Sequence, residues 1–357
     1  MACHIKQVLV TGETVSKKIT VALDAMGGDN APAEIVKGAL EAVGEKTCLT
    51  VILVGKEELI KKELSGCTFD RERVKIQPAS EVILMGEAPA KAIMTKRDSS
   101  INVGMKLVKK GEADAFISAG STGAVLVGSL GIIKTVKGVK RPALAPLIPT
   151  ENGPALLIDC GANVDARPDQ LEQFAVMGSL YMEHVVGRQS PRVGLANIGV
   201  EEEKGNALVK KTLPLLKERT DINFIGNVEA RDIPSGEADV IVCEAFTGNV
   251  ILKMYEGVSK VLLRTVKKSF MTNVKTKIGG CLVKGALKSS MKQFDASEHG
   301  GAPLLGLNGL VVKTHGNAKA KEIRNTLYQC IAFHDADLTE KIRSCIEKEQ
   351  KERKEES

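Results

Sequence analysis

The chain has 357 residues, and its 50 Lys and Arg residues outnumber its 44 Asp and Glu residues to give a mild net charge of +6. Trp is absent and aromatic residues make up only 3% of the chain, so we do not expect the stacking surfaces that bind single-stranded nucleic acid. The eight cysteines are scattered without a C-x-x-C pair, a pattern that lacks zinc-type spacing and suits a reducing cytosol. No apolar run reaches the roughly 18 residues needed to span a bilayer.

The predicted elements follow one pattern from residue 19 onward, after an N-terminal extension (residues 1–18) that lacks a signal-peptide core. A short apolar run ends in a polar or glycine-rich loop, and a helical stretch follows. The predicted strands cover residues 19–23, 49–54, 115–117, 155–158, 193–196, 240–243 and 310–312. Apolar runs without alternation are typical of strands buried on both faces. Their alternation with helices predicts a three-layer α/β/α fold with a mostly parallel sheet.

We expect a single α/β catalytic domain over residues 19–335 and a charged C-terminal helix or tail over residues 336–357. In an open parallel sheet, ligands bind beyond the carboxyl ends of the strands. The polar loops that follow the predicted strands lie at those ends. The sequence therefore predicts one composite cleft lined by several loops.

The loop after the first predicted strand reads Met26-Gly27-Gly28-Asp29-Asn30. Adjacent glycines let backbone N–H groups approach an anion, and Asp29 or Asn30 can cap the next helix, with Pro32 in its first turn. A purely structural turn explains the loop equally well. Asp24 at the strand end could orient a donor, but no cluster of carboxylates accompanies it, so we predict no metal.

Two further segments carry groups suited to an anion. Lys96-Arg97-Asp98-Ser99-Ser100 is either a solvated charge run with a serine cap or, beside a phosphate, a bidentate arginine clamp. Ser118-Ala119-Gly120-Ser121-Thr122-Gly123 follows a strand and precedes an apolar helix. Its small residues and hydroxyls favour phosphate binding as strongly as a tight capped turn. It is neither a Walker loop nor a G-x-G-x-x-G fingerprint.

Residues 252–294 differ from the rest, because they hold ten basic side chains and one acid, Glu256. Apolar residues at helical spacing predict two amphipathic helices with a break at Gly279-Gly280. The hairpin has two readings: a bundle with the same pair in a second subunit, or a surface for anionic lipid. The residues expected to contact a membrane or an acidic carrier protein are Arg264, Lys267, Lys268, Phe270, Ile278, Leu282 and Val283.

His315 is the only one of the five histidines that lies in a glycine loop after a predicted strand, Lys313-Thr314-His315-Gly316. It is a candidate catalyst, although a structural hydrogen bond explains a lone histidine equally well. No G-x-S-x-G elbow is present, so a covalent acyl-enzyme is not expected.

Together these motifs resemble the bacterial phosphate acyltransferase family (the PlsX type). The stretches that carry the resemblance are, in the family's order, residues 22–32, 96–100, 117–124, 159–165, 173–179, 197–199, 246–249, 300–306 and 315–316. The resemblance implies an enzyme that transfers a long-chain fatty acyl group from acyl-carrier protein to inorganic phosphate and supplies acyl phosphate for phospholipid synthesis. It implies a fold similar to phosphate acetyltransferases and isopropylmalate-type dehydrogenases, and no cofactor.

The resemblance also implies a homodimer. The scattered cysteines indicate the cytoplasm, and the composition of residues 252–294 predicts peripheral association with the inner face of the membrane. Its partners would be acyl-carrier protein, phosphate and an anionic membrane surface, and a downstream membrane acyltransferase is a further candidate. We predict His315, Lys96 and Asn163 as catalytic residues. The residues predicted to bind phosphate or the acyl group are Asp24, Gly27, Gly28, Asn30, Arg97, Ser99, Gly120, Ser121, Thr122, Gly123, Asn197, Thr247 and Asn249.

The sequence departs from the family's pattern at three places. Ser121 stands where Asn is expected, Glu244-Ala245 where Asp-Gly is expected, and Met94 where Arg is expected. Ser121 keeps a hydrogen-bonding group, so the anion loop is expected to survive. Met94 leaves the basic segment with one cation fewer.

Three alternatives stay open. A short-chain acyl-CoA:phosphate acyltransferase would have no use for a membrane-facing hairpin. A metal- and nicotinamide-dependent dehydrogenase would need a carboxylate cluster and a dinucleotide fingerprint, and the sequence has neither. A non-catalytic membrane scaffold would not need convergent glycine loops.

Overall fold

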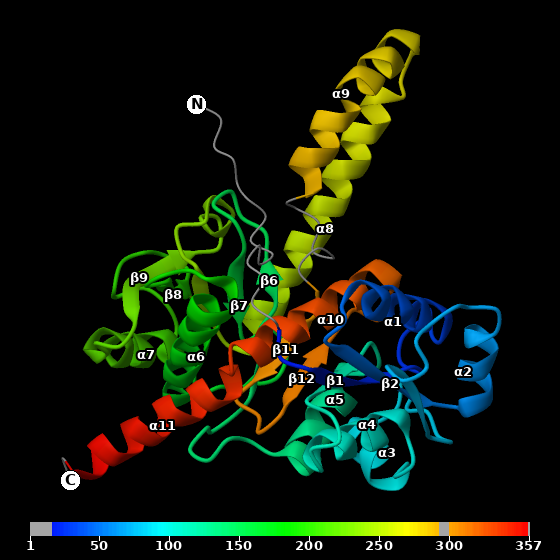
Figure 1. The fold of residues 1–357 in the computed structure, drawn as a ribbon. Coiled ribbons are helices and arrows are strands. Elements are labelled where there is room, and N and C mark those ends of the chain that lie inside the picture. The colour runs from blue at the N-terminus through cyan, green and yellow to red at the C-terminus, as the bar shows by residue number, and fades with distance from the viewer. Residues whose placement is uncertain (1–15, 293–299, 356–357) are drawn as a thin grey trace.

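The computed structural model of this chain describes residues 16–292 and 300–355 and divides their strands between two sheets (Figure 1). Most of the predicted N-terminal extension, residues 1–15, and the end of the predicted hairpin, residues 293–294, lie outside the described residues. The three-layer, mostly parallel α/β fold is confirmed. The division into two sheets was not predicted.

The first sheet has its strands in the order β3 (Val74–Pro78), β2 (Leu49–Gly55), β1 (Ile19–Asp24), β4 (Ala115–Ser118), β12 (Leu310–Lys313), β11 (Ala302–Leu305) and β5 (Ala143–Leu144). The strands from β3 to β12 run parallel, whereas β11 is antiparallel to both of its neighbours. Successive residues of β4 enter different clusters, with Ala115 and Ile117 on one face and Phe116 on the other. Because both faces are covered, these strands are apolar without alternation.

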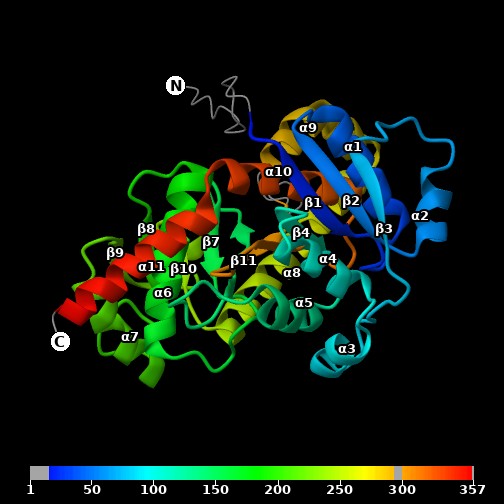
Figure 2. The same cartoon turned by 60° about the horizontal axis from the view of Figure 1, so that its bottom comes forward.

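Helices cover both faces of this sheet (Figure 2). On one face α1 (Ala33–Glu45) packs against α10 (Ala320–Asp335). On the other, α4 (Ser100–Lys109) contacts β1, β2 and β4, and α3 (Pro89–Thr95) and α5 (Thr122–Gly128) pack beside it. α2 (Glu57–Leu64) lies near the edge strand β3.

The second sheet has its strands in the order β6 (Leu147–Ile148), β7 (Ala155–Ile158), β10 (Val240–Val242), β8 (Arg192–Asn197) and β9 (Asn223–Glu229), all parallel except β6. α6 (Pro168–Tyr181) packs on it, with α7 (Ala207–Glu218) and α11 (Leu338–Glu355) next to α6. One buried apolar cluster includes strands of both sheets. Within it the rings of Tyr181 and Phe333 lie 5.2 Å apart between centroids and join α6 to α10.

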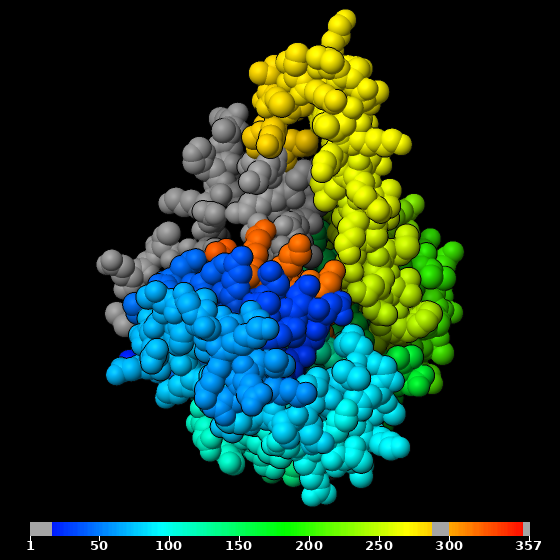
Figure 3. Space-filling view, turned by 90° about the vertical axis from the view of Figure 1, so that its right-hand side faces the viewer, coloured from blue at the N-terminus to red at the C-terminus, as the bar shows by residue number. Residues whose placement is uncertain are grey.

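Two long helices, α8 (Ala245–Phe270) and α9 (Val274–Lys292), form a hairpin that projects from the body of the protein (Figures 1 and 3). The predicted break at Gly279-Gly280 is wrong, because the chain turns at residues 271–273 and both glycines lie within α9. The turn forms where Asn273 and Thr276 cap each other: the Asn273 side chain accepts from the Thr276 N–H at 3.0 Å, and the Thr276 hydroxyl accepts from the Asn273 N–H at 3.1 Å. This is the reciprocal capping that starts a helix.

Short helical turns complete the described fold. π-helical turns at Ser129–Ile133 and Met182–Val186 extend α5 and α6, and a 3₁₀ turn covers Ile233–Ser235. Within residues 16–292 and 300–355, no helix combines the length and the apolar character that crossing a membrane requires.

Candidate active site

Three glycine-containing loops meet beyond the carboxyl ends of β1, β4 and β12, which are neighbours in the first sheet. The N–H of Asp29 donates to the carbonyl oxygen of Gly316 at 2.7 Å. Gly28 has a φ of +95°, and a Cβ atom there would lie 2.7 Å from the Gly316 carbonyl oxygen and 2.9 Å from the Ala119 Cβ. Only glycine allows this approach. Loops far apart in the sequence therefore form one surface.

Asn30 joins two of these loops instead of capping a helix. Its side-chain amide donates to the carbonyl oxygens of Asn317 at 3.0 Å and Ala318 at 3.1 Å. The predicted cap is wrong, because Pro32 occupies the N-cap of α1 and makes no side-chain capping bond. Asn30 still contributes to the predicted site, because its side chain links the loop after β1 to the loop after β12.

The carboxylate of Asp24 lies directly under the loops, almost completely buried. Its Oδ2 accepts from the Ser118 hydroxyl at 2.6 Å and its Oδ1 from the Met26 N–H at 3.1 Å. The Ser118 oxygen in turn accepts from the Gly120 N–H at 3.0 Å. Burial raises the pKa of Asp24, and these hydrogen bonds act against that rise. Asp24 thus holds the first two loops together through Ser118, which was not predicted as a site residue.

Lys313, at the end of β12, is a second buried charge beside this network and was not predicted either. It is only 7% exposed, and its ammonium group donates to the Thr314 carbonyl oxygen. Burial lowers the pKa of Lys313 to about 8, while the carboxylates of Glu322 and Asp24 act in the opposite direction. Its position at a strand end was visible in the sequence. Its burial against two acids was not.

The predicted phosphate loop begins α5. The Ser121 hydroxyl caps that helix by accepting from the Ala124 N–H at 3.4 Å. In the described part of the chain, the N–H groups of Thr122 and Gly123 meet no hydrogen-bond acceptor. The capped turn therefore coexists with two backbone donors that an anion could use.

Lys96, Arg97 and Ser99 lie where α3 passes to α4. The Lys96 ammonium forms an ion pair with Glu87 at 2.6 Å and donates to the Val82 carbonyl oxygen at 2.8 Å. Arg97 is exposed. Ser99 is completely buried and caps α4, which is the simpler of its two readings.

The loop after β7 is built around the buried Asp159. Its carboxylate accepts from the backbone N–H groups of Leu144 at 3.0 Å and Asn163 at 2.8 Å, among others. The Asn163 side-chain amide donates to Asp159 at 2.8 Å and to the Pro142 carbonyl oxygen at 2.7 Å. Burial raises the pKa of Asp159. Both amide hydrogens of Asn163 thus serve the loop, so its side chain offers a substrate only its carbonyl oxygen.

The loop after β10 starts α8 and contacts the loop after β7. Glu244 caps the helix by accepting from the N–H groups of Phe246 at 2.5 Å and Thr247 at 3.1 Å, and the Thr247 hydroxyl also bonds to it. The Ala245 N–H donates to the Asn163 carbonyl oxygen at 3.0 Å. Glu244 therefore has a structural use at the position where the sequence departs from the family's pattern.

Asn197 and Asn249 are the remaining predicted residues. Asn249 is exposed on the second turn of α8. The Asn197 side chain donates to the Lys204 carbonyl oxygen at 3.3 Å within its own loop, and its buried Oδ1 has no hydrogen-bond partner among the described residues.

His315 is the residue that connects the two groups of loops. Its N–H donates to the Glu322 carboxylate at 3.0 Å, and its Nε2 lies 3.7 Å from Oε1 of Glu256 on α8. Its side chain is 40% exposed. The predicted catalytic histidine therefore lies partly exposed between the first sheet and the base of the hairpin.

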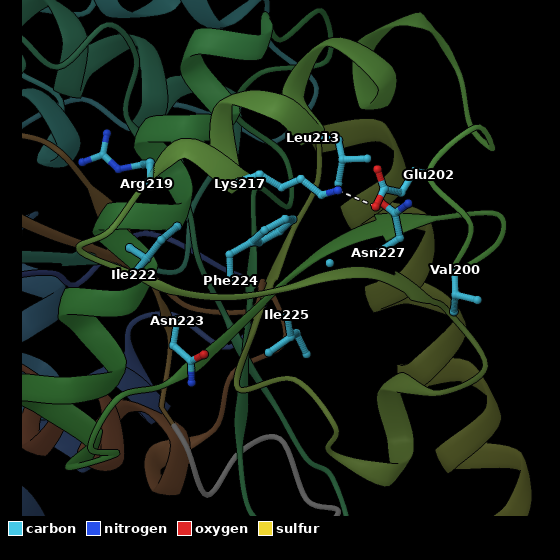
Figure 4. Close-up of a pocket in the computed structure, with 11 residues that line it drawn as sticks. Val200, Glu202, Leu213, Lys217, Arg219, Ile222, Asn223, Phe224, Ile225 and Asn227 are labelled. Carbon is cyan, nitrogen blue, oxygen red and sulfur yellow. Dashed lines mark ion pairs between the residues drawn. The ribbon is translucent and has the colours of Figure 1, made fainter.

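A cavity of about 660 Å³ lies elsewhere, beside the edge strand β9 and α7 (Figure 4). An ion pair between Lys217 and Glu202 crosses part of it. It is lined by Val200, Glu202, Leu213, Lys217, Arg219, Ile222, Asn223, Phe224, Ile225, Gly226 and Asn227. None of the predicted site residues belongs to it. Among the described residues, no group of three or more His, Cys, Asp or Glu side chains could hold a metal ion.

Comparison with known proteins identifies the family to which the chain is similar. The model of the family described as "Fatty acid synthesis protein" matches residues 19–341. A phosphate acyltransferase of Clostridium tetani is 47% identical over 323 residues, which cover 90% of this chain and 96% of that protein. A phosphotransacetylase from Streptococcus pyogenes has a similar structure, with a TM-score of 0.61, 19% identity and coverage of 89% of this chain and 94% of that one. A 4-hydroxythreonine-4-phosphate dehydrogenase from Klebsiella pneumoniae shares the fold at a TM-score of 0.50 and 14% identity, covering 91% and 99% of the two chains.

Proposed function

The chain belongs to the fatty acid synthesis protein family and is a phosphate acyltransferase, and from that premise we propose that it transfers a long-chain fatty acyl group from acyl-carrier protein to inorganic phosphate. The product would be an acyl phosphate for phospholipid synthesis. The observation that carries the proposal is the meeting of the Gly27-Gly28, Gly120-Gly123 and His315-Gly316 loops on neighbouring strands. Such loops present backbone N–H groups, which suit a phosphate.

In the proposed reaction, phosphate binds the Ser118–Gly123 loop and one of its oxygens attacks the thioester carbon. The new O–C bond forms, the C–S bond breaks, and the carrier leaves as a thiolate that takes up a proton. A thiolate is a good leaving group and phosphate is already an anion, so direct attack needs no acyl-enzyme. The task of the protein is to position the reactants and to place donors near the developing negative charge. The proposed donors are His315, the Thr122 hydroxyl and the N–H groups of Thr122 and Gly123.

The preference for acyl-carrier protein over a small thioester rests on the hairpin. Lys267 and Lys268 are exposed near its distal end, where they would attract an acidic carrier. Large apolar side chains are exposed on the facing helix α9, including Ile278 at 59%, Leu282 at 82% and Val283 at 43%. Apolar and basic groups on one helical surface suit anionic lipid, so we propose peripheral association with a membrane. A homodimer in which two hairpins pack together would cover the same apolar groups.

The proposal is tested by incubating the purified protein with phosphate and either long-chain acyl-carrier protein or the matching acyl-CoA. We expect acyl phosphate, trapped as the hydroxamate, to form faster from the carrier-bound chain. A protein that uses short acyl-CoA alone would be the related short-chain enzyme, and one that forms no acyl phosphate would refute the proposal.

Site variants test the proposed donors. His315→Ala and Thr122→Val should each lower turnover, because losing one donor to a developing oxyanion typically costs about 10²–10³ in rate. Near-full turnover in both folded variants would show that this site assignment is wrong. Isolation of a covalent acyl-enzyme would contradict direct transfer.

A further inference from the structure

Residues 252–294 contain ten basic side chains and a single acidic one, Glu256. Its side chain is only 17% exposed, whereas that of Lys253, one turn earlier on α8, is 56% exposed. An acid that merely balanced the charge of a solvated helix would be as exposed as the lysines around it. Its burial at the base of the hairpin indicates a role in contacts with the body of the protein.

Among the described residues, two groups face the Glu256 carboxylate. The Lys253 ammonium donates to both of its oxygens, at 3.2 Å for Oε1 and 3.1 Å for Oε2, and Nε2 of His315 lies 3.7 Å from Oε1. Because Nε2 faces α8, Nδ1 is the ring nitrogen left to face a substrate. With a proton on Nε2 directed at Glu256, Nδ1 donates a hydrogen bond only in the imidazolium form, in which both ring nitrogens carry a proton. The backbone of His315 is fixed separately, by its N–H bond to Glu322 at 3.0 Å and by the Ala318 N–H bond to its carbonyl oxygen at 3.1 Å.

The helix that carries Glu256 is itself anchored in the second sheet. The Ala245 N–H donates to the Asn163 carbonyl oxygen, and the backbone at Gly248 lies so close to the Asp159 carbonyl oxygen that any side chain would collide with it. The imidazole is thus held from two sides. The first sheet fixes its backbone, and the second sheet, through α8, fixes the carboxylate that the ring faces.

We propose that Glu256 is a positioning residue for the acyl transfer: its carboxylate holds the imidazole of His315 so that Nδ1 faces the reacting groups. Glu256 touches no substrate and forms no bond in the reaction. A ligand or donor ring that a second group orients loses activity when that group is removed, because the ring can then turn. The inference rests on the proposed function, since it takes His315 as the donor.

The test is a double-mutant cycle with Glu256→Gln, His315→Asn and the double variant, assayed with whichever thioester the wild-type protein uses. Glu256→Gln should lower kcat by up to about 100-fold, the cost of misplacing a reacting group by about 1 Å, with little change in KM for phosphate. In the His315→Asn background the same change should have no further effect, because the two residues act as one unit. The same fold-loss in both backgrounds would overturn the proposal.

Two control variants separate orientation from general damage to the helix. Lys253→Gln removes the other ion pair of Glu256 but leaves the carboxylate opposite His315, so it should keep kcat close to wild type. Glu256→Asp keeps the charge and should recover part of the lost kcat. If Lys253→Gln loses as much activity as Glu256→Gln, the loss reflects the hairpin and the proposal is wrong.

A spectroscopic measurement needs no substrate. The ¹⁵N resonances of the His315 ring, identified by their absence in His315→Asn, should shift in Glu256→Gln and stay in place in Lys253→Gln. Unchanged resonances in Glu256→Gln would overturn the positioning contact whatever the reaction is. Conversely, shifted resonances in a protein whose His315→Asn variant keeps full turnover would leave the contact in place and refute its catalytic use.

Discussion

Buried charges lie under the loops of the cleft, on neighbouring strands of the first sheet. The Asp24 carboxylate is 1% exposed and the Lys313 side chain belongs to a residue that is 7% exposed. A buried charge is costly unless it is hydrogen-bonded or paired, and each of these has partners in the loops themselves. The charges thus serve to fix loop geometry, and their removal should be felt both in stability and in the site.

Ser118→Ala should destabilise the protein by about 1–3 kcal/mol, because it removes one of the two hydroxyl donors, Ser100 and Ser118, of the buried Asp24 carboxylate. It also removes the acceptor of the Gly120 N–H. Ser129→Ala is a matched control, since Ser129 is equally buried but its hydroxyl bonds only to the Val125 carbonyl oxygen at 2.7 Å. Urea unfolding of both variants measures the difference. Equal losses of unfolding free energy would show that the Asp24–Ser118 hydrogen bond contributes no more to stability than the Ser129–Val125 bond.

The burial of Lys313 predicts how the free energy of unfolding depends on pH. Its pKa falls from the ordinary 10.5 to about 8 in the folded protein because of burial. Between pH 8 and 10.5 the unfolded chain therefore holds more protons than the folded one at this residue, and raising the pH favours folding. Between pH 7.5 and 9.5 the unfolding free energy of the wild type should gain about 2 kcal/mol relative to Lys313→Met. A difference between the two proteins that does not change with pH would contradict the burial of a titrating ammonium.

The sequence predicts where many of the site residues lie relative to the strands. Asp24, the Ser118–Gly123 loop and His315 all follow apolar runs, and the ends of parallel strands meet at one edge of a sheet. The pairings were not predictable. Ser118 bridges Asp24 and Gly120, and the Asn163 amide donates to Asp159 and Pro142. These hydrogen bonds depend on side-chain directions, which the spacing of apolar residues does not encode.

At the scale of elements, the hairpin combines two kinds of surface on one pair of helices. The first half of α8, up to Glu256, packs partly against the body of the protein. From Gly257 onward no residue of α8 is buried, so this distal part is open to water or to a partner. Its exposed apolar residues include Val258 at 56%, Val261 at 54% and Leu262 at 55%. An apolar surface of this kind, rimmed by cations, marks an interaction site.

Charge reversal tests the carrier-docking part of that surface. Lys267→Glu with Lys268→Glu should raise the apparent KM for acyl-carrier protein several-fold and leave the KM for phosphate nearly unchanged, because rim charges act mainly on association. Lys61→Glu with Lys62→Glu is the matched control, since it reverses two adjacent exposed lysines on α2, away from the hairpin (Figure 1). Equal effects on both substrates, or an equal effect of the control pair, would place carrier docking elsewhere.

The position of the hairpin turn shows why a glycine pair does not always mark a helix end. A Gly-Gly pair costs a helix only about 1 kcal/mol per glycine, and packing can offset that. Gly280 lies against Phe270 of the facing helix, where a Cβ atom would be 3.1 Å from the ring. The glycine is there for the close approach of α8 and α9, and the cap at Asn273 decides where α9 begins.

At the scale of the whole molecule, the split into two sheets was beyond the reach of the sequence. The strands that lie beside the split, β5 and β6, have two residues each, too few to show a period. The candidate site nevertheless draws on both sheets, through the loops after β1, β4 and β12 in the first and those after β7 and β10 in the second. His315 and Glu256 meet between them.

The proposed function covers the exposed apolar residues of the hairpin with lipid, with a second copy of the chain, or with both. Leu282→Glu with Val283→Glu should abolish flotation with anionic vesicles and leave activity in solution unchanged, because both side chains are exposed and belong to α9, which projects from the body of the protein (Figure 1). Analytical ultracentrifugation of the same variant separates the two readings. Loss of a dimer without any vesicle binding by the wild type at low salt would assign the hairpin to subunit packing alone.

The place of β12 in the first sheet has a consequence for how the chain is made. β12 lies between β4 and β11, so the second edge of β4 stays open until residues near the C-terminus leave the ribosome. At about 5–20 residues per second, the stretch between Ser118 and Leu310 takes on the order of ten to forty seconds to synthesise. Throughout that interval a nascent chain displays an unpaired apolar strand, which is a template for pairing with other chains. A chain that stops before Leu310 never closes that edge, so truncation should expose the protein to aggregation rather than simply shorten it.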